Sequence, residues 1–359
     1  AGHRLILVGR RPLNNLTDTL FNPQTYCQTD LSQPDAAETI VAWLRTQAID
    51  QLDLLIHNAG SGYFGSSAAQ DVELIAQLLN VNLYTPIHLT HQLFPWLNRA
   101  QGQVVFVSSV ATAVPTPEYA VYGASKAALE GFARSLKVEW QGKITVQVVR
   151  PGATHTGMHA KIGLTREQLD WEKFPLAEKV AAQIITAIEK KRPSATIGFG
   201  NKLLTFVGRN GRFLLDPLMQ KRSQQLTSSS TSQHTQLVCA ITGAADGIGK
   251  AIAFRYAKAG YAIVGIDVDQ VRAAKMAAQI QAAGGQANFI IGDLSSQAGL
   301  ANIKAQLANT APFSCFIHNA GISAVGRFET IPVDKQLAVL NLNLLAPLWL
   351  TAVLFSENW

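Results

Sequence analysis

Tyr122 is followed four residues later by Lys126, within a segment of helix-forming composition. On a helix this spacing puts the phenol and the ammonium group on one face. A nearby positive charge favours the phenolate and lowers the pKa of the tyrosine, which suits a general acid or base. Ser109 lies 13 residues before Tyr122, at the end of a predicted strand over 104–107. These residue types and spacings predict proton transfer to or from a bound molecule.

A glycine-rich turn in the second half of the chain predicts a nucleotide site. It falls between the apolar run 237–241 and the amphipathic run 250–259, and it contains Gly243, Gly247, Ile248 and Gly249. Glycines there let the backbone approach a pyrophosphate, which the free N–H groups of a helix N-terminus stabilise. Asp267 ends the next predicted strand, where a carboxylate can bind both ribose hydroxyls and repel a 2′-phosphate. We therefore expect this segment to bind NAD(H).

Two motifs occur twice at one offset. Leu55–Gly60 recurs as Phe316–Gly321, and Leu79–Leu83 recurs as Leu340–Leu344, in both cases 261 positions later. Matching order, spacing and residue type together indicate a duplicated unit.

The segment between the copies is rich in Ser, Thr and Gln and has no apolar periodicity, which is typical of a flexible linker. The predicted organisation is a domain over 1–222, a linker over 223–235 and a second domain over 236–359.

Alignment of the copies indicates that each is cut short. The first copy would begin about 22 positions inside its domain, without its first strand and phosphate loop, and Trp359 corresponds to position 98 of the first copy. The second copy would therefore stop before any counterpart of the Tyr122 region. We expect a fragment of a longer tandem protein. The alternative is a permuted arrangement in which Leu237–Gly260 completes the first copy.

The same alignment places Gly9 opposite Asp267, followed by Arg10 and Arg11. Guanidinium groups suit a phosphate, so the first copy is expected to prefer NADP(H). The alternative for these two arginines is ordinary solvated charge at a strand end.

Apolar runs alternate with helix-length segments in both copies. Strands are predicted over 5–8, 54–57, 104–107, 145–149, 237–241, 262–266, 288–291 and 314–318. Continuous apolar strands alternating with helices are typical of an α/β fold with a doubly wound parallel sheet in three layers, like a Rossmann fold.

The motifs TGxxxGxG, NAG, NxN, Ser, YxxxK and PG, in this order, resemble those of the short-chain dehydrogenase/reductase family. The resemblance covers nearly all of 1–200 and 237–359. It implies that Tyr122 exchanges a proton with the substrate oxygen and that Ser109 hydrogen-bonds this oxygen. Lys126 would lower the pKa of Tyr122 and hold the nicotinamide ribose, and Asn82 would support a proton-relay water. The implied substrate is a small carbonyl compound or alcohol.

The resemblance also implies further cofactor contacts. In the first copy these are Asp30 beside the adenine, Asn58, Ala59 and Gly60 at the pocket, Pro151, Gly152 and Thr156, with Thr154 as an alternative to Thr156. In the second copy the matching residues are Asp293, Asn319, Ala320, Gly321 and Asn343. His57 and His318 precede the NAG turns and are expected to be structural. The family resemblance also implies a homo-oligomer.

Charge and cysteine content limit the partners. The segment from Glu189 to Arg222 contains eight basic and two acidic residues. Its net charge therefore equals the net charge of the whole chain, +6. A domain-closing helix with solvated charges is favoured here, and contact of 189–222 with an anionic membrane surface is the alternative. No basic patch interleaved with aromatic residues indicates nucleic-acid binding.

Cys27, Cys239 and Cys315 are far apart and are expected to be reduced core residues in the cytoplasm. No Cys, His and Asp pattern indicates a metal. The apolar run Leu340–Leu354 is interrupted by Asn and Pro, and we expect no membrane-spanning segment.

The apolar residues of 157–175 predict a lid over a hydrophobic substrate. Cofactor preference favours reduction in the first copy and oxidation in the second, which could form a sequential redox pair. The alternative function is a non-catalytic dinucleotide-binding scaffold or regulatory pseudoenzyme.

Overall fold

The computed structural model describes residues 4–66, 70–158, 162, 164, 169–210, 237–310, 312–357 and 359. Their contacts separate two compact units. The first unit holds the described residues up to 66, those of 73–210 and Arg327–Thr330, and the second holds the rest. The predicted linker 223–235 and the end of the basic segment, 211–222, lie outside the described residues.

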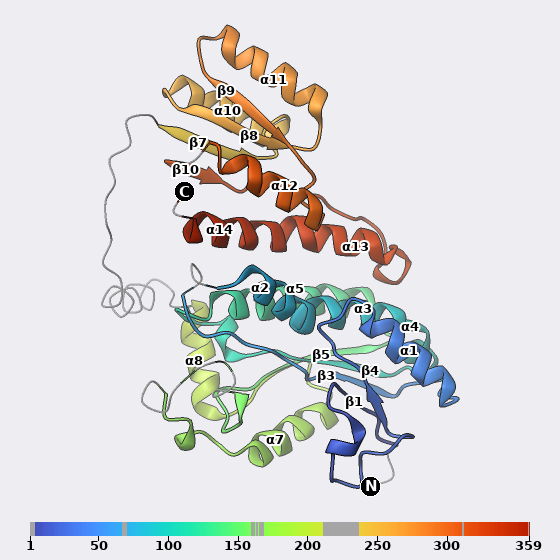
Figure 1. The fold of residues 1–359 in the computed structure, drawn as a ribbon. Coiled ribbons are helices and arrows are strands. Elements are labelled where there is room, and N and C mark those ends of the chain that lie inside the picture. Colours follow the sequence, from blue (N-terminus) through green and yellow to red (C-terminus); the bar gives the residue numbers. More distant parts are fainter. Residues whose placement is uncertain are drawn as a thin grey trace. The chain divides into compact units, whose positions relative to one another are not determined.

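The first unit contains two parallel sheets (Figure 1). β1 (Leu7–Gly9) pairs with β2 (Tyr26–Gln28). The second sheet has the order β3, β4, β5, β6, formed by Leu54–His57, Gln103–Val107, Thr145–Arg150 and Ser194–Thr196.

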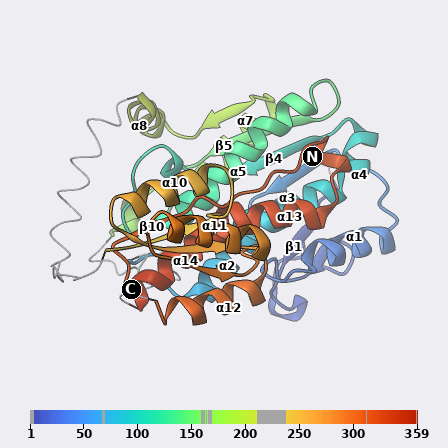
Figure 2. The same cartoon turned by 90° about the horizontal axis from the view of Figure 1, so that it is seen from above.

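Helices cover both faces of the four-stranded sheet because its central strands are apolar on both sides. α7 (Ala177–Glu189) packs on one face, where Val105 and Val149 meet Val180 and Ile188. On the other face Phe106 contacts Phe132 of α5 (Ala120–Glu139). α5 lies along β4 and β5 when seen from above (Figure 2).

The remaining helical elements of the first unit connect these layers. They are η1 (Leu13–Asn15), α1 (Ala36–Thr46), α2 (Val72–Leu79), the π-helical turn η2 (Asn80–Tyr84), α3 (Thr85–Gln92), α4 (Phe94–Ala100), η3 (Val110–Thr112), η4 (Trp171–Lys173) and α8 (Phe199–Asn210). α1 and α3 pack over β2 through a cluster that includes Cys27, Leu44 and Leu93.

The second unit has one parallel sheet in the order β10, β7, β8, β9, formed by Cys315–Ile317, Val238–Thr242, Ala262–Asp267 and Ala287–Ile291. α10 (Gly247–Lys258) and α11 (Gln270–Ala282) cover one face, and α12 (Gln297–Leu307) and α14 (Ala346–Ser356) cover the other (Figure 1). α13 (Val333–Leu340) and η6 (Asn341–Leu345) complete this unit, whereas η5 (Phe328–Thr330), which precedes α13 in the sequence, belongs to the first unit. The predicted parallel α/β architecture is confirmed.

The two units differ in how the first strand of each copy pairs with its neighbours. In the second unit β7 lies between β8 and β10, whereas β1 and β3 of the first unit do not pair within the described residues. The neighbouring side chains Val8, Leu54 and Ile56 are consequently exposed. β7 belongs to the sheet of the second unit, so the permuted alternative does not describe this structure.

The expectation that no segment is long and apolar enough to span a membrane was wrong. Val333–Ser356 forms one helix of 24 residues, and an 18-residue stretch of it has a mean hydropathy of 1.9, so it is long and apolar enough by length and composition. Pro347 does not interrupt it: the π-helical turn η6 directly precedes α14, in whose first turn the proline lies. Ala346 and Leu350 pack in the sheet core of the second unit. We therefore interpret this segment as a helix of the fold. Of its 18-residue apolar stretch, 22% is buried.

Candidate active site

Tyr122 and Ser109 meet beyond the carboxyl end of β4. Ser109 follows the strand and caps η3 by accepting a hydrogen bond from the N–H group of Ala111 at 3.2 Å. Tyr122 lies in the first turn of α5, where the Ser109 side chain acts on its hydroxyl to lower its pKa. The structure thus brings together two side chains that the sequence separates by 13 residues.

Lys126 lies one turn further along α5 and is only 4% exposed. Its Nζ donates a hydrogen bond to the carbonyl oxygen of Val107 at 3.1 Å. The same Nζ would lie 3.5 Å from a Cβ atom placed on Gly60. Burial lowers the pKa of Lys126 to about 8. The ammonium group is therefore fixed between the end of β4 and the NAG turn.

Asn82 connects this group to the loop after β3. It is fully buried in the π-helical turn η2, where its side-chain Nδ2 donates to the carbonyl oxygen of Ser61 and its Oδ1 accepts from the N–H of Ser61, both at 2.8 Å. Nδ2 also contacts the hydroxyl of Ser125 at 3.0 Å, and this hydroxyl donates to the carbonyl oxygen of Tyr122. Single π-turns of this kind occur frequently at functional sites.

The pKa of Tyr122 does not follow the prediction from the Tyr-Lys spacing. Burial raises the pKa of Tyr122, and only the hydrogen bond with Ser109 opposes this shift. The ammonium group of Lys126 is bonded to a backbone carbonyl instead. In this structure Tyr122 is therefore a protonated phenol at neutral pH.

Glu130 joins the elements around the site and is only 12% exposed. Its carboxylate accepts two hydrogen bonds from Arg150 at 2.6 Å, one from Ser108 at 2.7 Å and one from Thr112 at 2.9 Å. Arg209 of α8 adds an ion pair at 3.0 Å. Burial would raise the pKa of Glu130, but these bonds outweigh it and the pKa is lowered. The residues before and after Ser109 are thereby tied to α5 and β5.

His57 at the end of β3 has a structural environment. Its Nε2 lies 2.8 Å from the hydroxyl of Thr90, and its ring stacks on Phe106. Burial and the nearby charge of Lys126 lower the pKa of His57 to about 3, so the ring is neutral. His318 pairs with Thr351 at 3.0 Å in the second unit.

The predicted cofactor residues of the first unit lie in three places. Arg10 approaches Asp30 at 3.9 Å just after β1, and Arg11 is also exposed there. Bonds from Ser32 lower the pKa of Asp30, so that its carboxylate is charged. Asn58, Ala59 and Gly60 form the turn after β3, and Pro151, Gly152 and Thr156 follow β5.

Thr156 and Met158, which follow β5, lie at the start of the segment predicted to form a lid over the substrate. The hydroxyl of Thr156 accepts a hydrogen bond from the N–H of Met158 at 3.4 Å. Met158 and Ile162 lie beside Gly62, at 3.0 and 3.4 Å from an added Cβ atom. Residues 159–161, 163 and 165–168 of the predicted lid lie outside the described residues.

The glycine-rich turn of the second unit has the geometry that its glycines predict. Gly243 and Gly247 have positive φ angles of 65° and 54°, which side chains disfavour. A Cβ atom on Gly249 would lie 2.0 Å from the carbonyl oxygen of Gly243 and 2.5 Å from Nδ2 of Asn319. Ile248 is exposed on the first turn of α10. This cradle fits the pyrophosphate of a dinucleotide.

Asp267 braces the same turn. One carboxylate oxygen accepts from the N–H of Ala245 at 2.9 Å and the other from the N–H of Asp269 at 3.1 Å. Asn319 donates to the carbonyl oxygens of Thr242 and Gly243 at 3.0 and 3.1 Å. Ala320 and Gly321 continue this turn after β10, and Asp293 caps the turn after β9 by accepting from Ser295.

Several hydrogen bonds recur between the units. Asn343 holds the backbone of Ile322 as Asn82 holds that of Ser61. Asn341 donates to the carbonyl oxygen of Ser295, as Asn80 does to that of Ser32.

Three further residues at the site, Ser125, Glu130 and Arg150, were not predicted from the sequence. Glu130 lies two helical turns after Tyr122, so it shares a helix face with Tyr122 and Lys126, and Arg150 directly precedes the PG motif. These spacings were available, but a lone carboxylate on a helix is more often a solvated charge. Among the residues that the structure describes, no group of His, Cys, Asp or Glu could hold a metal ion.

Comparison with known proteins identifies the family of the chain. The bovine (Bos taurus) dehydrogenase/reductase SDR family member 7B is 30% identical over 218 residues, which cover 55% of this chain and 66% of that protein. The chain thus spans less than two thirds of the length of this relative. A short-chain dehydrogenase structure from Streptomyces avermitilis has a TM-score of 0.51 at 22% identity, covering 63% of this chain and 90% of that one.

A short chain dehydrogenase from Burkholderia cenocepacia, solved with NADP, has a TM-score of 0.50 at 20% identity and covers 63% of this chain and 88% of that one. At these identities the two structures share the fold with this chain. The sequence profile of the short chain dehydrogenase family matches residues 1–167 and 237–357, which are more than half of the chain. The chain therefore belongs to the short-chain dehydrogenase family of oxidoreductases.

Proposed function

We propose that the first unit interconverts a carbonyl compound and a secondary alcohol with a nicotinamide cofactor. The observation that carries this proposal is the juxtaposition of Tyr122 with Ser109, whose side chain lowers the Tyr122 pKa, with Lys126 and Asn82 fixed beside them. A phenol and a hydroxyl that lie side by side can both hydrogen-bond a single substrate oxygen.

Each side chain has a distinct role in the reductive direction. Ser109 hydrogen-bonds the substrate carbonyl oxygen, and Tyr122 donates its phenolic proton to this oxygen as the carbonyl carbon accepts a hydride. The bound nicotinamide supplies this hydride. Lys126 would stabilise the phenolate that remains and, with a cofactor bound, would hold the nicotinamide ribose. Asn82 fixes the loop that carries Ser61 and supports the water through which Tyr122 is reprotonated.

Burial keeps Tyr122 protonated at neutral pH, and the expected preference for NADP(H) favours reduction in the first unit. A protonated phenol is the form that can act as an acid. Arg10 and Arg11, exposed after β1, support a preference for NADP(H), because their guanidinium groups can pair with a 2′-phosphate. Arg10 lies near Asp30 without a close hydrogen bond, so it remains able to turn toward an anion.

The second unit is proposed to be a duplicated copy that binds NAD(H). Asp267 at the end of β8 would accept hydrogen bonds from the ribose hydroxyls, and its charge would repel a 2′-phosphate. A preference for NAD(H) favours oxidation, so the two copies could act in sequence on one substrate.

The substrate class is proposed to be apolar. Met158 and Ile162 cover the Gly62 loop, and the rings of Tyr119 and Tyr122 meet with centroids 5.9 Å apart. An apolar lining favours hydrophobic or aromatic ketones over polar ones. Reduction rates on ketones matched in size test this point, and faster reduction of the polar set would contradict it.

The deciding experiment follows oxidation of NADPH and NADH by the protein with a panel of ketones, for the wild type and Tyr122→Phe. The variant is expected to lower kcat by roughly 10²- to 10⁴-fold, because it removes the acid. Tyr84→Phe is the matched control, since the buried Tyr84 hydroxyl has no hydrogen-bond partner among the described residues. Dinucleotide binding without turnover of any ketone would favour the scaffold function instead.

A further inference from the structure

The α8 helix presents its apolar side chains to solvent. Phe199, Leu203 and Phe206 are 84%, 59% and 67% exposed. These positions follow the i, i+4, i+7 spacing and therefore form one stripe along the helix, which Leu204 and Val207 widen. Isolated exposed apolar residues are ordinary, but a contiguous stripe marks an interaction surface.

The opposite side of α8 is small and polar, and it is the buried side. Thr205 and Gly208 face the first unit. A Cβ atom on Gly208 would lie 2.2 Å from the carbonyl oxygen of Ala113, so the helix backbone rests directly on the loop after η3. The helix therefore cannot roll to bury its apolar stripe without losing this close contact. A domain-closing helix with solvated charges, the interpretation favoured from sequence, predicts the reverse orientation.

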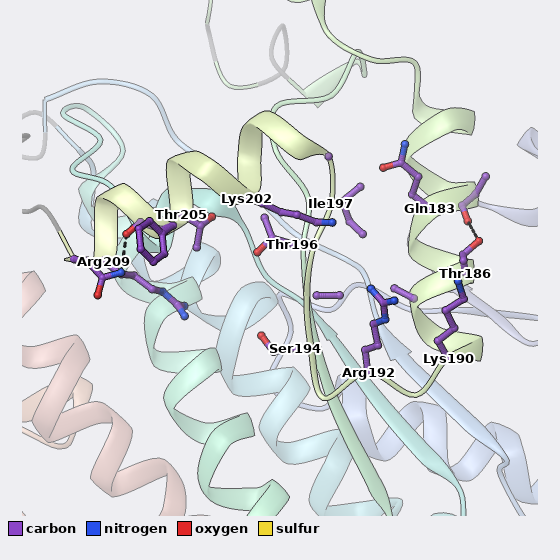
Figure 3. Close-up of a pocket in the computed structure, with 16 residues that line it drawn as sticks. Gln183, Thr186, Lys190, Arg192, Ser194, Thr196, Ile197, Lys202, Thr205 and Arg209 are labelled. Carbon is purple, nitrogen blue, oxygen red and sulfur yellow. Dashed lines mark hydrogen bonds between the residues drawn. The ribbon is translucent and has the colours of Figure 1, made fainter.

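A basic groove runs beside the stripe. A cavity of about 680 Å³ lies between α7, β6 and α8, and Phe206 forms part of both surfaces. Its charged lining residues are Lys190, Arg192, Lys202 and Arg209, with no aspartate or glutamate among the lining residues. Figure 3 shows Lys202 extending from α8 and Arg192 and Lys190 from the opposite wall.

The positive charge of this groove is largely uncompensated. Arg209 pairs with Glu130. Lys190, Arg192 and Lys202 form no ion pair within the part of the chain that the structure describes. Hydroxyl groups of Ser194 and Thr196 line the same groove and can donate hydrogen bonds to anionic oxygens.

We propose that the apolar stripe of α8 and the basic groove together dock on an anionic lipid surface. An apolar helix face flanked by lysine and arginine is the composition that inserts at a headgroup boundary, with the cations on anionic headgroups. A second copy fits less well, because a two-fold contact through this patch would oppose the same cations. The docking does not depend on the proposed function.

The test is sedimentation of the protein with vesicles of phosphatidylcholine alone or with added phosphatidylserine. Binding is expected only with phosphatidylserine, and it should weaken as salt rises. The triple variant Lys190→Gln, Arg192→Gln, Lys202→Gln should lose about 100-fold in affinity. The double variant Leu203→Ser, Phe206→Ser should lose binding even at low salt.

Matched controls use exposed residues elsewhere. Val271→Ser on α11 removes an equally exposed apolar side chain, and Lys258→Gln removes a cation at the end of α10. Both should bind vesicles like the wild type. Circular dichroism establishes that each variant is folded.

Unchanged vesicle binding of folded α8 variants would overturn the proposal. Equal binding to both vesicle types would also overturn it. The same holds if the protein fails to bind vesicles and instead associates with polyglutamate or with a second copy of itself.

Discussion

At the residue scale, the environment of a titratable group decides its role more than its type does. Tyr122 lies near Lys126 in the sequence and His57 lies near it in space. Burial raises the pKa of Tyr122 and lowers that of His57. The directions differ because burial disfavours the charged form, which is the deprotonated tyrosine but the protonated histidine. Tyr122 is kept protonated and His57 is kept neutral. The first state suits proton donation, and the second suits a structural hydrogen bond with Thr90.

The His57 pKa predicts a pH dependence of stability. Because the folded pKa of about 3 lies below the unfolded value of 6.5, the unfolded chain takes up a proton first as pH falls. Stability should therefore fall from about pH 6.5 downward, by roughly 2 kcal/mol at about pH 5. His57→Gln should flatten this slope, measured by urea unfolding of the first unit at several pH values. Gln141→Ala, at an exposed position, serves as control, and an unchanged slope in His57→Gln would contradict the prediction.

At the scale of elements, the active site depends on how α5, the end of β4 and β5 are held together. Glu130 is the common partner of Ser108, Thr112 and Arg150, which come from these elements. Removal of one partner of a buried ion pair leaves the other charge buried and uncompensated. The resulting loss of unfolding free energy exceeds the free energy that the intact pair contributes.

Glu130→Gln is therefore expected to lower the unfolding free energy by about 3 kcal/mol. It should also lower kcat more than it changes KM, because the Ser109 loop loses its fixed position while the binding surface remains. Urea unfolding and steady-state kinetics measure the two effects. Glu178→Gln, an exposed carboxylate in the first turn of α7, should change the unfolding free energy by less than about 0.5 kcal/mol. Equal effects of the two substitutions would refute the role of Glu130.

The turn between β7 and α10 makes a second prediction at this scale. Gly249→Ala would place a Cβ atom 2.0 Å from the carbonyl oxygen of Gly243, so the turn must deform. We expect dinucleotide binding by the second unit to weaken at least 10-fold, measured by calorimetry. Gly131→Ala on α5 is the matched substitution, because its Cβ atom meets nothing within 4 Å. It should leave binding intact and stabilise the helix by about 1 kcal/mol. Wild-type affinity in Gly249→Ala would show that the turn is not the phosphate site.

At the scale of the whole molecule, the described residues form two compact units with separate sheets. Each unit keeps its own core, so each can be stabilised by its own ligand. A ligand present at about 100 times its Kd stabilises the unit that binds it by about 2.7 kcal/mol.

Hydrogen exchange of the protein with each cofactor tests the cofactor assignment. NADP(H) is expected to slow exchange in β4 and β5, and NAD(H) in β7 and β8. Asp267→Ser should allow NADP(H) to protect the second unit as well, because it removes the carboxylate that repels a 2′-phosphate. Protection of both units by either cofactor in the wild type would contradict the assignment.

The sequence by itself determined the family and most of the strands. Tyr122, Lys126 and Ser109 could be selected because their spacing reflects one helix and one strand end, and β3 was predicted with its observed bounds because an apolar run is a local signal. β2 and β6 were missed, since each has only three residues and gains its strand character from its neighbours.

Only the tertiary structure decided how distant residues meet. The Glu130 cluster joins residues up to 79 positions apart, and the ion pair with Arg209 depends on how α8 docks. The exposure of the apolar stripe of α8 was also not predicted. Periodicity in the sequence gives the width of an apolar stripe but not whether it faces the core or the solvent. The 333–356 helix continues through Asn341, Asn343 and Pro347, with Asn343 bonded to the loop of Ile322 and the π-helical turn η6 placed directly before α14, which contains the proline. Such outcomes depend on packing between segments, which no local pattern contains.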